Sequence, residues 1–181
     1  MALTFNFELA RQTLFKSGYT QLQVDSINAL VDEANKQGIV LKTQLAYILG
    51  TAYHECYDPR HPELRLTPMV EFGGSVYLKS KKYYPFYGRG FVQLTWRDNY
   101  EKESKRLGLK LLTNPDLVLD TKIAANIAVH GMTKGTFTGK KLSDYITANK
   151  TDFPNARRII NGIDKMALIA SYASLFLKCI V

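Results

Sequence analysis

Apolar side chains recur every three or four positions through the first third of the chain, a period that predicts helices. A short helix is expected over residues 5–17. A third helix is expected from Thr43 to about Tyr57, with Gly50 in its interior. Glycine inside a helix costs about 1 kcal/mol relative to alanine, so Gly50 indicates close packing against another element. Between these two lies an amphipathic helix that ends near Gly38 and whose apolar face is Val24, Ile27, Leu30, Val31 and Ala34.

The middle of the chain has no helical period. Residues 58–63 are rich in turn formers and predict a loop. Residues 64–84 mix short apolar runs with two adjacent glycines, which favours irregular loop or ribbon over helix. A turn with a short strand is expected over residues 86–95, and a helix over residues 98–107. These residues predict a small, irregular β element.

The last third of the chain is again helical in pattern. Asn114-Pro-Asp116 predicts a helix start, because proline suits the first turn. Glycines at 131, 135 and 139 are expected to break the chain. Further helices are expected over residues 142–148 and 155–161 and from Asp164 onward. The sequence has no repeat or linker, so residues 1–181 predict one mainly α domain with its β element in the middle.

Composition and charge narrow the function. The 181 residues are 46% hydrophobic and 22% charged, typical of a soluble globular protein. No apolar run reaches the roughly 20 residues that span a bilayer, and no secretory signal is visible, so synthesis in the cytoplasm without stable membrane insertion is expected. The net charge of +8 indicates an anionic partner. No nucleic-acid-binding motif accompanies it, so nucleic acid is not expected.

The cysteines and histidines do not predict a metal site. Cys56 and Cys179 fit no metal-ligand spacing, and they are expected to be reduced, structural thiols. His61 and His130 have no partners at ligand spacing, and Glu55 does not belong to a zinc-peptidase motif. We therefore expect neither a metal nor an organic cofactor.

Three glutamates are candidates for acid–base chemistry. Hydrolysis of a glycosidic bond needs one carboxyl group that protonates the leaving oxygen and a second carboxylate. Glu55 falls at the end of the third predicted helix, where the helix dipole favours the protonated form. Glu63 and Glu71 follow within the irregular region and can supply the second carboxylate. Glutamates are common, so this pattern alone is weak.

A longer motif makes the hypothesis specific. His54-Glu55, followed by Tyr87-Gly-Arg-Gly-Phe-Val-Gln-Leu-Thr-Trp-Arg-Asp-Asn-Tyr100, resembles the core of family-19 glycoside hydrolases, which are chitinases and, in a shorter form, bacteriophage endolysins. The resemblance covers about residues 40–176. The compact length and residues 137–145 are more similar to the phage lysins. The resemblance implies a lysozyme-like fold with the β element beside the active-site cleft.

The resemblance implies roles for individual residues. Glu55 matches the general acid. Glu71 is similar to the general base, with Glu63 as the alternative. Thr95 stands where the family usually has a serine that positions the attacking water; it keeps the hydroxyl but adds a methyl group that restricts its rotamers. No metal takes part in the implied mechanism.

Further residues are expected to contact the substrate: His54, Tyr87, Gln93, Asn99 and Asn161. His54 would support the acid by a hydrogen bond, or it would cap its own helix. Arg89 is expected to form a structural ion pair. Trp96 has two readings, stacking on a sugar or packing in the core.

The implied function is that of an endolysin that cleaves β-1,4 bonds in the glycan strands of peptidoglycan by an inverting mechanism. A chitinase with the same residues and a non-catalytic wall-binding protein are the alternatives. A monomer is expected. An enzyme made in the host cytoplasm would need a separate holin-type protein to reach the cell wall.

Overall fold

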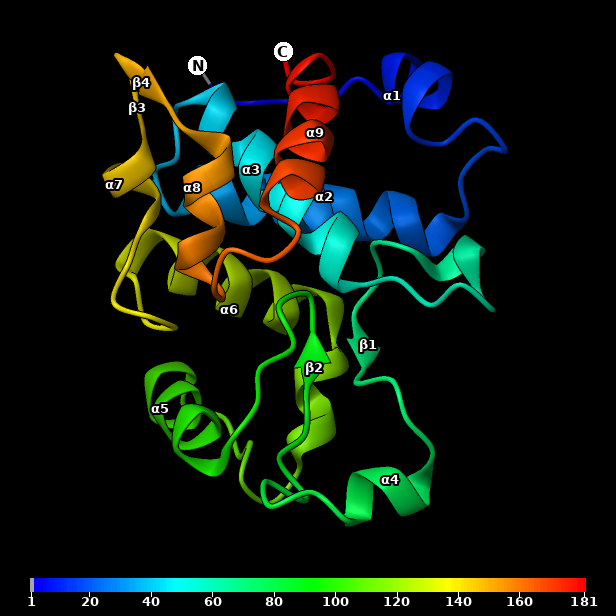
Figure 1. Ribbon diagram of the computed structural model, residues 1–181, viewed down its shortest axis with the longest axis vertical. Helices are drawn as coiled ribbons and strands as arrows, with labels where there is room; N and C mark the ends of the chain where they lie inside the picture. Colours follow the sequence, from blue (N-terminus) through cyan, green and yellow to red (C-terminus); the bar gives the residue numbers. More distant parts are fainter. Residues whose placement is uncertain (1) are drawn as a thin grey trace.

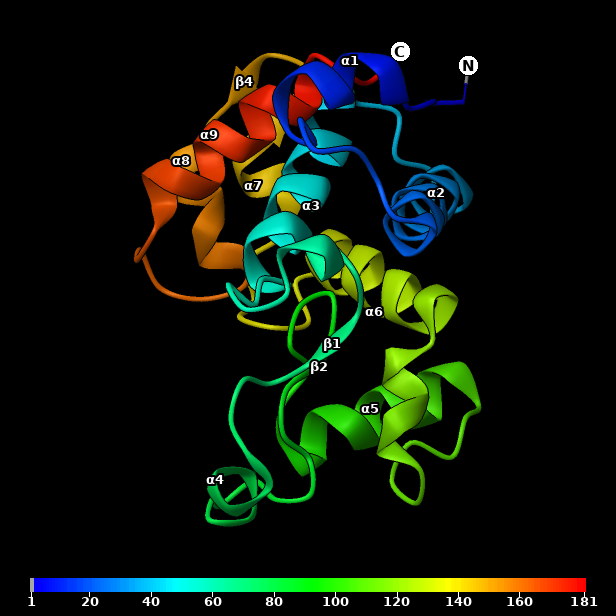
Figure 2. The same cartoon turned by 90° about the vertical axis from the view of Figure 1, so that its right-hand side faces the viewer.

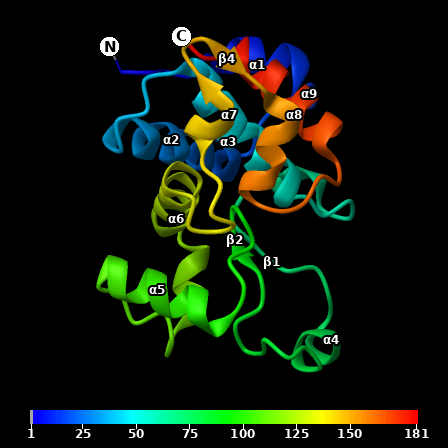
Figure 3. The same cartoon turned by 60° about the vertical axis from the view of Figure 1, so that its left-hand side comes forward.

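The computed structural model describes residues 2–181, and its elements form two groups along the long axis (Figure 1). The larger group contains α1, α2, α3, α7, α8 and α9. The smaller contains α4 and α5, while α6 and the strands β1 and β2 lie between the groups, as Figures 2 and 3 also show. The bounds in chain order are α1 Phe7–Thr13, α2 Gln21–Lys36, α3 Lys42–Glu55, β1 Met69–Val70, α4 Ser75–Lys79, β2 Arg89–Gly90, α5 Arg97–Leu107, α6 Thr121–Lys134, α7 Leu142–Tyr145, β3 Ile146–Thr147, β4 Lys150–Thr151, α8 Phe153–Ala156 and α9 Met166–Leu177.

Helix α3 is the centre of the core. Every side chain from Leu45 to Tyr53 is buried, and α9 packs along it. Gly50 makes this contact possible, since a Cβ atom there would lie 2.8 Å from the backbone nitrogen of Ala173. The prediction of close packing at Gly50 is confirmed. Because α3 is enclosed in this way, its last turn has a fixed position.

Helix α6 differs from the prediction at both ends. Residues 115–119 form a 3₁₀ turn, and the α-helix begins only after Asp120, whose carboxylate accepts the backbone N–H groups of Lys122 and Ile123. The expected break at Gly131 is wrong. This glycine lies inside the helix and leaves room for the ring of Phe137, which a Cβ atom would overlap. The helix ends at Gly135, whose φ is +74°.

Two short elements escaped the sequence pattern. Helix α4 lies within the region expected to be irregular, because its five residues are too few to show a period. The helix expected over residues 142–148 stops at Tyr145, and β3 and β4 follow as an antiparallel hairpin. The helix expected over residues 155–161 is α8 with a 3₁₀ turn over Arg157–Ile159.

The strands β1 and β2 pair antiparallel, with Met69 opposite Gly90 and Val70 opposite Arg89. Both cysteines are buried free thiols, as expected, and burial raises the pKa of each. Over residues 2–181, no helix combines the length and the apolar character needed to cross a membrane.

Candidate active site

Strand β2 is the place where the segments that carry the candidate carboxylates meet. Cys56, directly after Glu55 at the end of α3, donates from its Sγ to the carbonyl oxygen of Gly90 at 3.3 Å. Glu71, directly after β1, donates its backbone N–H to the carbonyl oxygen of Gly88 at 2.7 Å. The end of α3 and the end of β1 are therefore both fastened to residues 88–90. Glu55 is the last residue of α3, and Glu71 is the first residue after β1.

Glu55 is paired with an arginine from the far end of the chain. Its carboxylate is 17% exposed and accepts a hydrogen bond from Nη1 of Arg157, which is 4% exposed. Arg157 also donates from Nε to the carbonyl oxygen of Asp164 at 3.2 Å and lies 3.6 Å from its carboxylate. Glu55 therefore experiences both the dipole at the end of its helix and the positive charge of Arg157. The resemblance over residues 40–176 covered Arg157 but gave it no role.

His54 does not support Glu55 in the expected way. Over the described chain, its ring makes no hydrogen bond to the Glu55 carboxylate, and it lies against the ring of Tyr172 with 6.5 Å between centroids. Burial lowers the pKa of His54, and the charges of Arg157 and Arg65 lower it further, while Glu55 raises it. His54 is therefore neutral at neutral pH.

Glu71 is held from two sides. Its Oε1 accepts from the hydroxyl of Tyr83 at 2.6 Å, and its Oε2 accepts from the backbone N–H of Gly88 at 3.0 Å. The hydrogen bond to Glu71 raises the pKa of Tyr83 to about 12, so the tyrosine remains a donor. Both bonds hold the Glu71 carboxylate at a fixed position. Tyr83 was missed, because a tyrosine twelve residues away in an irregular region gives no sequence signal.

The side chains of Gln93 and Glu71 both lie close to the backbone of Gly88. A Cβ atom at Gly88 would lie 2.8 Å from Oε1 of Gln93 and 3.3 Å from Cβ of Glu71, so only glycine fits between them. Gln93 donates from Nε2 to the carbonyl oxygens of Met69 and Gly90, both at 3.1 Å. The amide nitrogen of Gln93 thus ties together the turn that carries the site.

Thr95 and Asn99 form a chain of hydrogen bonds that leaves a hydroxyl acceptor available. Thr95 donates from Oγ1 to the carbonyl oxygen of Gln93 at 2.8 Å, and Asn99 donates from Nδ2 to the carbonyl oxygen of Thr95 at 2.8 Å. A cavity of about 130 Å³ lies here, lined by Val92, Gln93, Leu94, Thr95, Trp96, Asn99, Phe137 and Ile160. A water molecule held by Thr95 would therefore meet both polar and apolar walls.

Trp96 and Arg89 resolve the two remaining alternatives. Trp96 is 52% exposed, so it is not a core residue; its ring meets the ring of Tyr83 edge to face at 5.2 Å. Arg89 is 2% exposed and pairs with Asp116 at 2.8 Å, which confirms the structural ion pair. Its guanidinium also lies over the ring of Tyr87, 3.7 Å from the centroid, so that face of Tyr87 is covered.

Within residues 2–181, two predicted residues make no hydrogen bond to residues 88–90. Asn161 is exposed in the turn that follows Arg157, and its Oδ1 accepts the backbone N–H of Gly162 at 2.9 Å. Glu63, the alternative base, is 54% exposed and pairs with His61 at 3.3 Å. Glu63 lines a different cavity, which is described below. The geometry brings Glu71, rather than Glu63, to the motif that contains Gln93 and Thr95.

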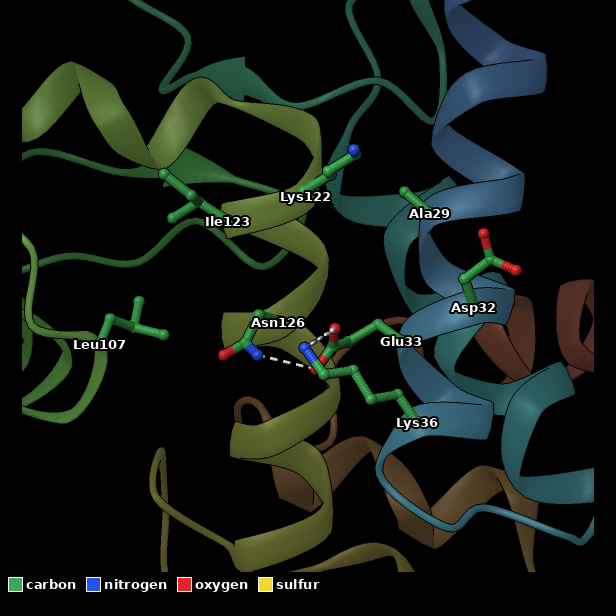
Figure 4. A pocket seen from close by; sticks show the side chains of 8 residues that line it. All are labelled: Ala29, Asp32, Glu33, Lys36, Leu107, Lys122, Ile123 and Asn126. Carbon is green, nitrogen blue, oxygen red and sulfur yellow. Dashed lines mark hydrogen bonds and ion pairs between the residues drawn. The ribbon is translucent and has the colours of Figure 1, made fainter.

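A separate hollow of about 330 Å³ lies between α2 and α6 (Figure 4). There Asn126 donates from Nδ2 to Glu33 at 2.7 Å, and Lys36 lies 3.9 Å from the same carboxylate. None of the residues predicted for the site lines this hollow. Across residues 2–181, no group of three histidine, cysteine, aspartate or glutamate side chains is placed to hold a metal ion.

Comparison with known proteins places this geometry in a family context. The family model described as "Chitinase class I" matches residues 70–146. An endochitinase of Arabidopsis thaliana is 35% identical over 88 residues, which cover 45% of this chain and 29% of the relative. The acidic endochitinase Q of Nicotiana tabacum is 49% identical over 45 residues, 24% of this chain and 18% of the relative. This chain thus matches less than a third of the length of these relatives.

One similar protein is named as inactive. The inactive chitinase-like protein 1 of Hevea brasiliensis is 50% identical over 38 residues, which cover 21% of this chain and 12% of the relative. Similarity to this chain over a short segment therefore extends to a protein named as inactive. Activity has to be argued from the carboxylates and their surroundings.

Solved structures extend the likeness of fold to nearly the whole chain. Chitinase C from Streptomyces griseus HUT6037 superposes with a TM-score of 0.61 at 18% identity, covering 97% of this chain and 77% of that one. A bacterial family 19 chitinase superposes with a TM-score of 0.58 at 17% identity, covering 95% and 94%. These likenesses confirm the predicted mainly α, lysozyme-like fold. Residues 70–146 of this chain thus match the family model of class I chitinases, and nearly the whole chain has the fold of family 19 chitinases.

Proposed function

We propose that this chain is an endolysin-type glycoside hydrolase that cleaves β-1,4 bonds in the glycan strands of bacterial peptidoglycan. One observation carries the proposal. Two segments that carry glutamates are fastened to opposite ends of residues 88–90, one through Cys56, which follows Glu55, and the other through the backbone of Glu71. Each glutamate has its own set of hydrogen-bond donors, as two carboxyl groups with different tasks require.

The proposed reaction is an inverting hydrolysis. Glu55 transfers its proton to the glycosidic oxygen as the bond from that oxygen to the anomeric carbon breaks. A water molecule attacks the same carbon from the opposite face and gives a proton to Glu71. Tyr83 and Gly88 keep the Glu71 carboxylate turned toward its water, and Oγ1 of Thr95 accepts a hydrogen bond from that water to orient it. The product has the α configuration.

Arg157 is proposed to position Glu55 during this cycle. Its guanidinium is buried and anchored to the backbone of Asp164, so it can hold one carboxyl oxygen while the other faces the substrate. The second bond of Arg157 to Asp164 keeps the cation partnered when Glu55 is protonated. When the substrate binds, its glycosidic oxygen lies beside Glu55 and can receive the proton of the carboxyl group.

Peptidoglycan is favoured by charge. The chain carries a net charge of +8, and the wall is anionic, so attraction concentrates the enzyme on its substrate. Chitin is the second candidate, because the relatives named above are chitinases and endochitinases. Chitin is uncharged, so the surplus of positive charge gives no advantage on that polymer.

Release of reducing ends from purified peptidoglycan and from chitin separates the two candidates. We expect release from peptidoglycan, with the new sugar end first seen as the α anomer by proton NMR. Activity on chitin alone would reject the choice of polymer. Mass spectrometry of the released fragments identifies which sugar carries the new reducing end.

Glu55→Gln tests whether the chain is an enzyme at all. The amide cannot donate a proton as an acid, so we expect a loss of turnover of roughly 10²–10⁴-fold, the range for a positioned acid. Binding to insoluble wall should persist, since the amide oxygen still accepts from Arg157. If the wild type releases no fragments and the variant lyses cells equally well, a non-catalytic wall-binding role replaces the proposal. Equal release of fragments by both would instead reject Glu55 as the acid.

A further inference from the structure

Arg65 occupies an unusual setting on the loop between α3 and β1. Its guanidinium lies over the rings of Tyr53, Tyr57 and Tyr172, with 3.6, 4.4 and 4.9 Å to the three centroids. Its Nε donates to the carbonyl oxygen of Tyr53 at 2.9 Å. Within residues 2–181 its two terminal nitrogens have neither a carboxylate partner nor a hydrogen-bond acceptor. Stacking covers the faces of the guanidinium and leaves the in-plane N–H groups available.

Arg60, on the same loop, provides the contrast. Its guanidinium also lies over an aromatic ring, 4.4 Å from the centroid of Phe72. Arg60, however, donates to both carboxylate oxygens of Asp58, and this hydrogen bonding lowers the pKa of Asp58 to about 2. Two stacked arginines lie five residues apart, and only Arg60 has a carboxylate from the chain itself. The lack of a carboxylate partner within residues 2–181 is therefore particular to Arg65 and not shared by Arg60.

Arg65 lines a cavity of about 370 Å³. This volume is within the range of small-ligand sites. The cavity combines tyrosine rings, a positive charge and a negative charge from Glu63, and its opposite wall is formed by the segment before α2. Its lining residues are Leu14, Phe15, Ser17, Gly18, Tyr19, Thr20, Gln23, Tyr53, Tyr57, Pro62, Glu63 and Arg65. Of the residues predicted for catalysis and substrate binding, only the alternative base Glu63 lines it.

We propose that this cavity binds a zwitterionic peptide, with the peptide carboxylate on the terminal nitrogens of Arg65 and an amino group near Glu63. In naming a wall stem peptide as the natural ligand, this inference rests on the proposed function. Such peptides branch from alternate sugars of peptidoglycan and carry both carboxylates and amines. A planar carboxylate can accept two parallel hydrogen bonds from the terminal N–H groups of a guanidinium. The tyrosines that stack on Arg65 hold these groups in place before the ligand binds. The site would hold the stem while the glycan lies along β2.

The proximity of this cavity to the candidate acid supports a shared substrate. Tyr53 and Tyr57 flank Glu55 in sequence, and Tyr53 supplies both a ring and a carbonyl oxygen to Arg65. The charge of Arg65 also reaches His54, the neighbour of Glu55. A glycan in the cleft and its peptide branch in the cavity would therefore contact the two sides of the same helix end.

The test is calorimetric titration of the intact protein with the tripeptide L-alanyl-γ-D-glutamyl-L-lysine, which contains no bond that the enzyme would cut. We expect saturable binding. The same tripeptide with both carboxyl groups amidated should bind about tenfold more weakly or worse, the loss that one charge-assisted hydrogen bond accounts for. Equal binding of the acid and amide forms, or no saturable binding by the wild type, would overturn the proposal.

Three variants locate the binding. Arg65→Met keeps the apolar stem and should lose binding to the same extent, whereas the matched control Arg60→Met should bind as the wild type does. Ser17→Trp fills the cavity from its exposed opposite wall without touching Arg65, and it should also abolish binding. This variant keeps the test decisive if Arg65→Met fails to fold. Wild-type binding in Ser17→Trp, or an equal loss in Arg60→Met, would contradict the assigned site.

The outcomes separate this inference from the proposed function. Hydrolysis of peptidoglycan without tripeptide binding would reject the cavity as a stem site and leave the enzyme. Tripeptide binding without hydrolysis of any glycan would support the cavity and reject the enzyme.

Discussion

At the scale of single residues, Glu55 and Glu71 differ in the kind of partner that holds them. Glu55 meets a buried cation, whereas Glu71 meets two neutral donors, a tyrosine hydroxyl and a backbone N–H. Arg157 also pairs with the carboxylate of Asp164, so its guanidinium keeps an anionic partner when Glu55 is protonated. Two neutral donors fix the Glu71 carboxylate without placing a charge beside it. These contacts show what holds each carboxylate, whereas the roles of acid and base are those implied by the resemblance to family-19 glycoside hydrolases.

The assignment of the base is tested by comparing Glu71→Gln with Glu63→Gln. Glu71→Gln should lower turnover by roughly 10²–10⁴-fold, because the amide cannot accept the proton of the water. Glu63→Gln is the matched control, with the same change at an exposed carboxylate away from β2. On glycan strands without stem peptides, which do not use the cavity beside Arg65, it should hydrolyse at close to the wild-type rate. The opposite ranking in a reducing-end assay would exchange the two roles.

The histidines give the fold a pH dependence. Burial lowers the pKa of both His54 and His130 below the ordinary value of 6.5. In the unfolded chain both take up protons at higher pH than in the folded chain, so the unfolded state binds more protons in that window. The free energy of unfolding should therefore be fully retained above about pH 6.5 and fall as the pH drops toward the folded-state values.

Urea denaturation between roughly pH 7 and pH 5 measures this loss. The double variant His54→Gln, His130→Gln should have a flatter profile in the same window. The paired Asp58 does not interfere, because its pKa lies lower still. A double variant with the wild-type slope would show that other groups dominate the pH dependence.

At the scale of elements, the position of the acid depends on how α3 is buried. Glu55 is the last residue of α3, and the helix cannot shift along its axis while Gly50 lies against the backbone of α9. The base depends on a different device. Only two residue pairs join β1 to β2, and the side chains of Gln93 and Cys56 add bonds to the same turn. A minimal sheet is thus held in place by side chains.

Gly50→Ala tests the contact between α3 and α9. Alanine raises helix propensity by about 1 kcal/mol, but its Cβ would lie 2.8 Å from backbone that cannot move freely. We expect the clash to win and the free energy of unfolding to fall by roughly 1–3 kcal/mol, the usual cost of overpacking. Gly162→Ala is the control, since nothing lies within 4 Å of a Cβ there. A Gly50→Ala variant as stable as this control in urea denaturation would mean that α9 can yield.

At the scale of the whole molecule, the positive charge is spread over the chain, so its effect should be a general attraction. Exposed charges are screened strongly once the Debye length falls below about 10 Å, which happens above roughly 0.1 M salt. The net charge of +8 should therefore help on an anionic polymer and have little effect on a neutral one.

Salt dependence of the two rates measures this attraction. Between roughly 0.05 and 0.5 M sodium chloride, hydrolysis of purified peptidoglycan should slow several-fold. Hydrolysis of soluble chito-oligosaccharides, which are uncharged, serves as the control and should change little. Equal slowing on both substrates would remove charge as a reason to prefer the wall polymer.

The sequence by itself determined the helices with a long apolar face, because periodic burial is written into the order of residues. It predicted α2 and α3 to within a few residues, the contact at Gly50 and the ion pair of Arg89. It did not predict α4 or the β3–β4 hairpin, whose few residues show no period. It also misread Gly131, where the room left by a missing Cβ is taken by a ring six residues further on.

For the site, the motif pointed to Glu55, Glu71, Gln93, Thr95 and Asn99, and their roles stay predictions. Only the tertiary structure decided which groups hold them. Arg157 reaches Glu55 from 102 residues away, and Tyr83 reaches Glu71 from a loop without regular pattern. The stacked, unpaired Arg65 is likewise invisible in the sequence, because three rings from two distant segments define it. Local spacing records what a residue is able to do, whereas the partner that directs it is set by contacts between segments far apart in the chain.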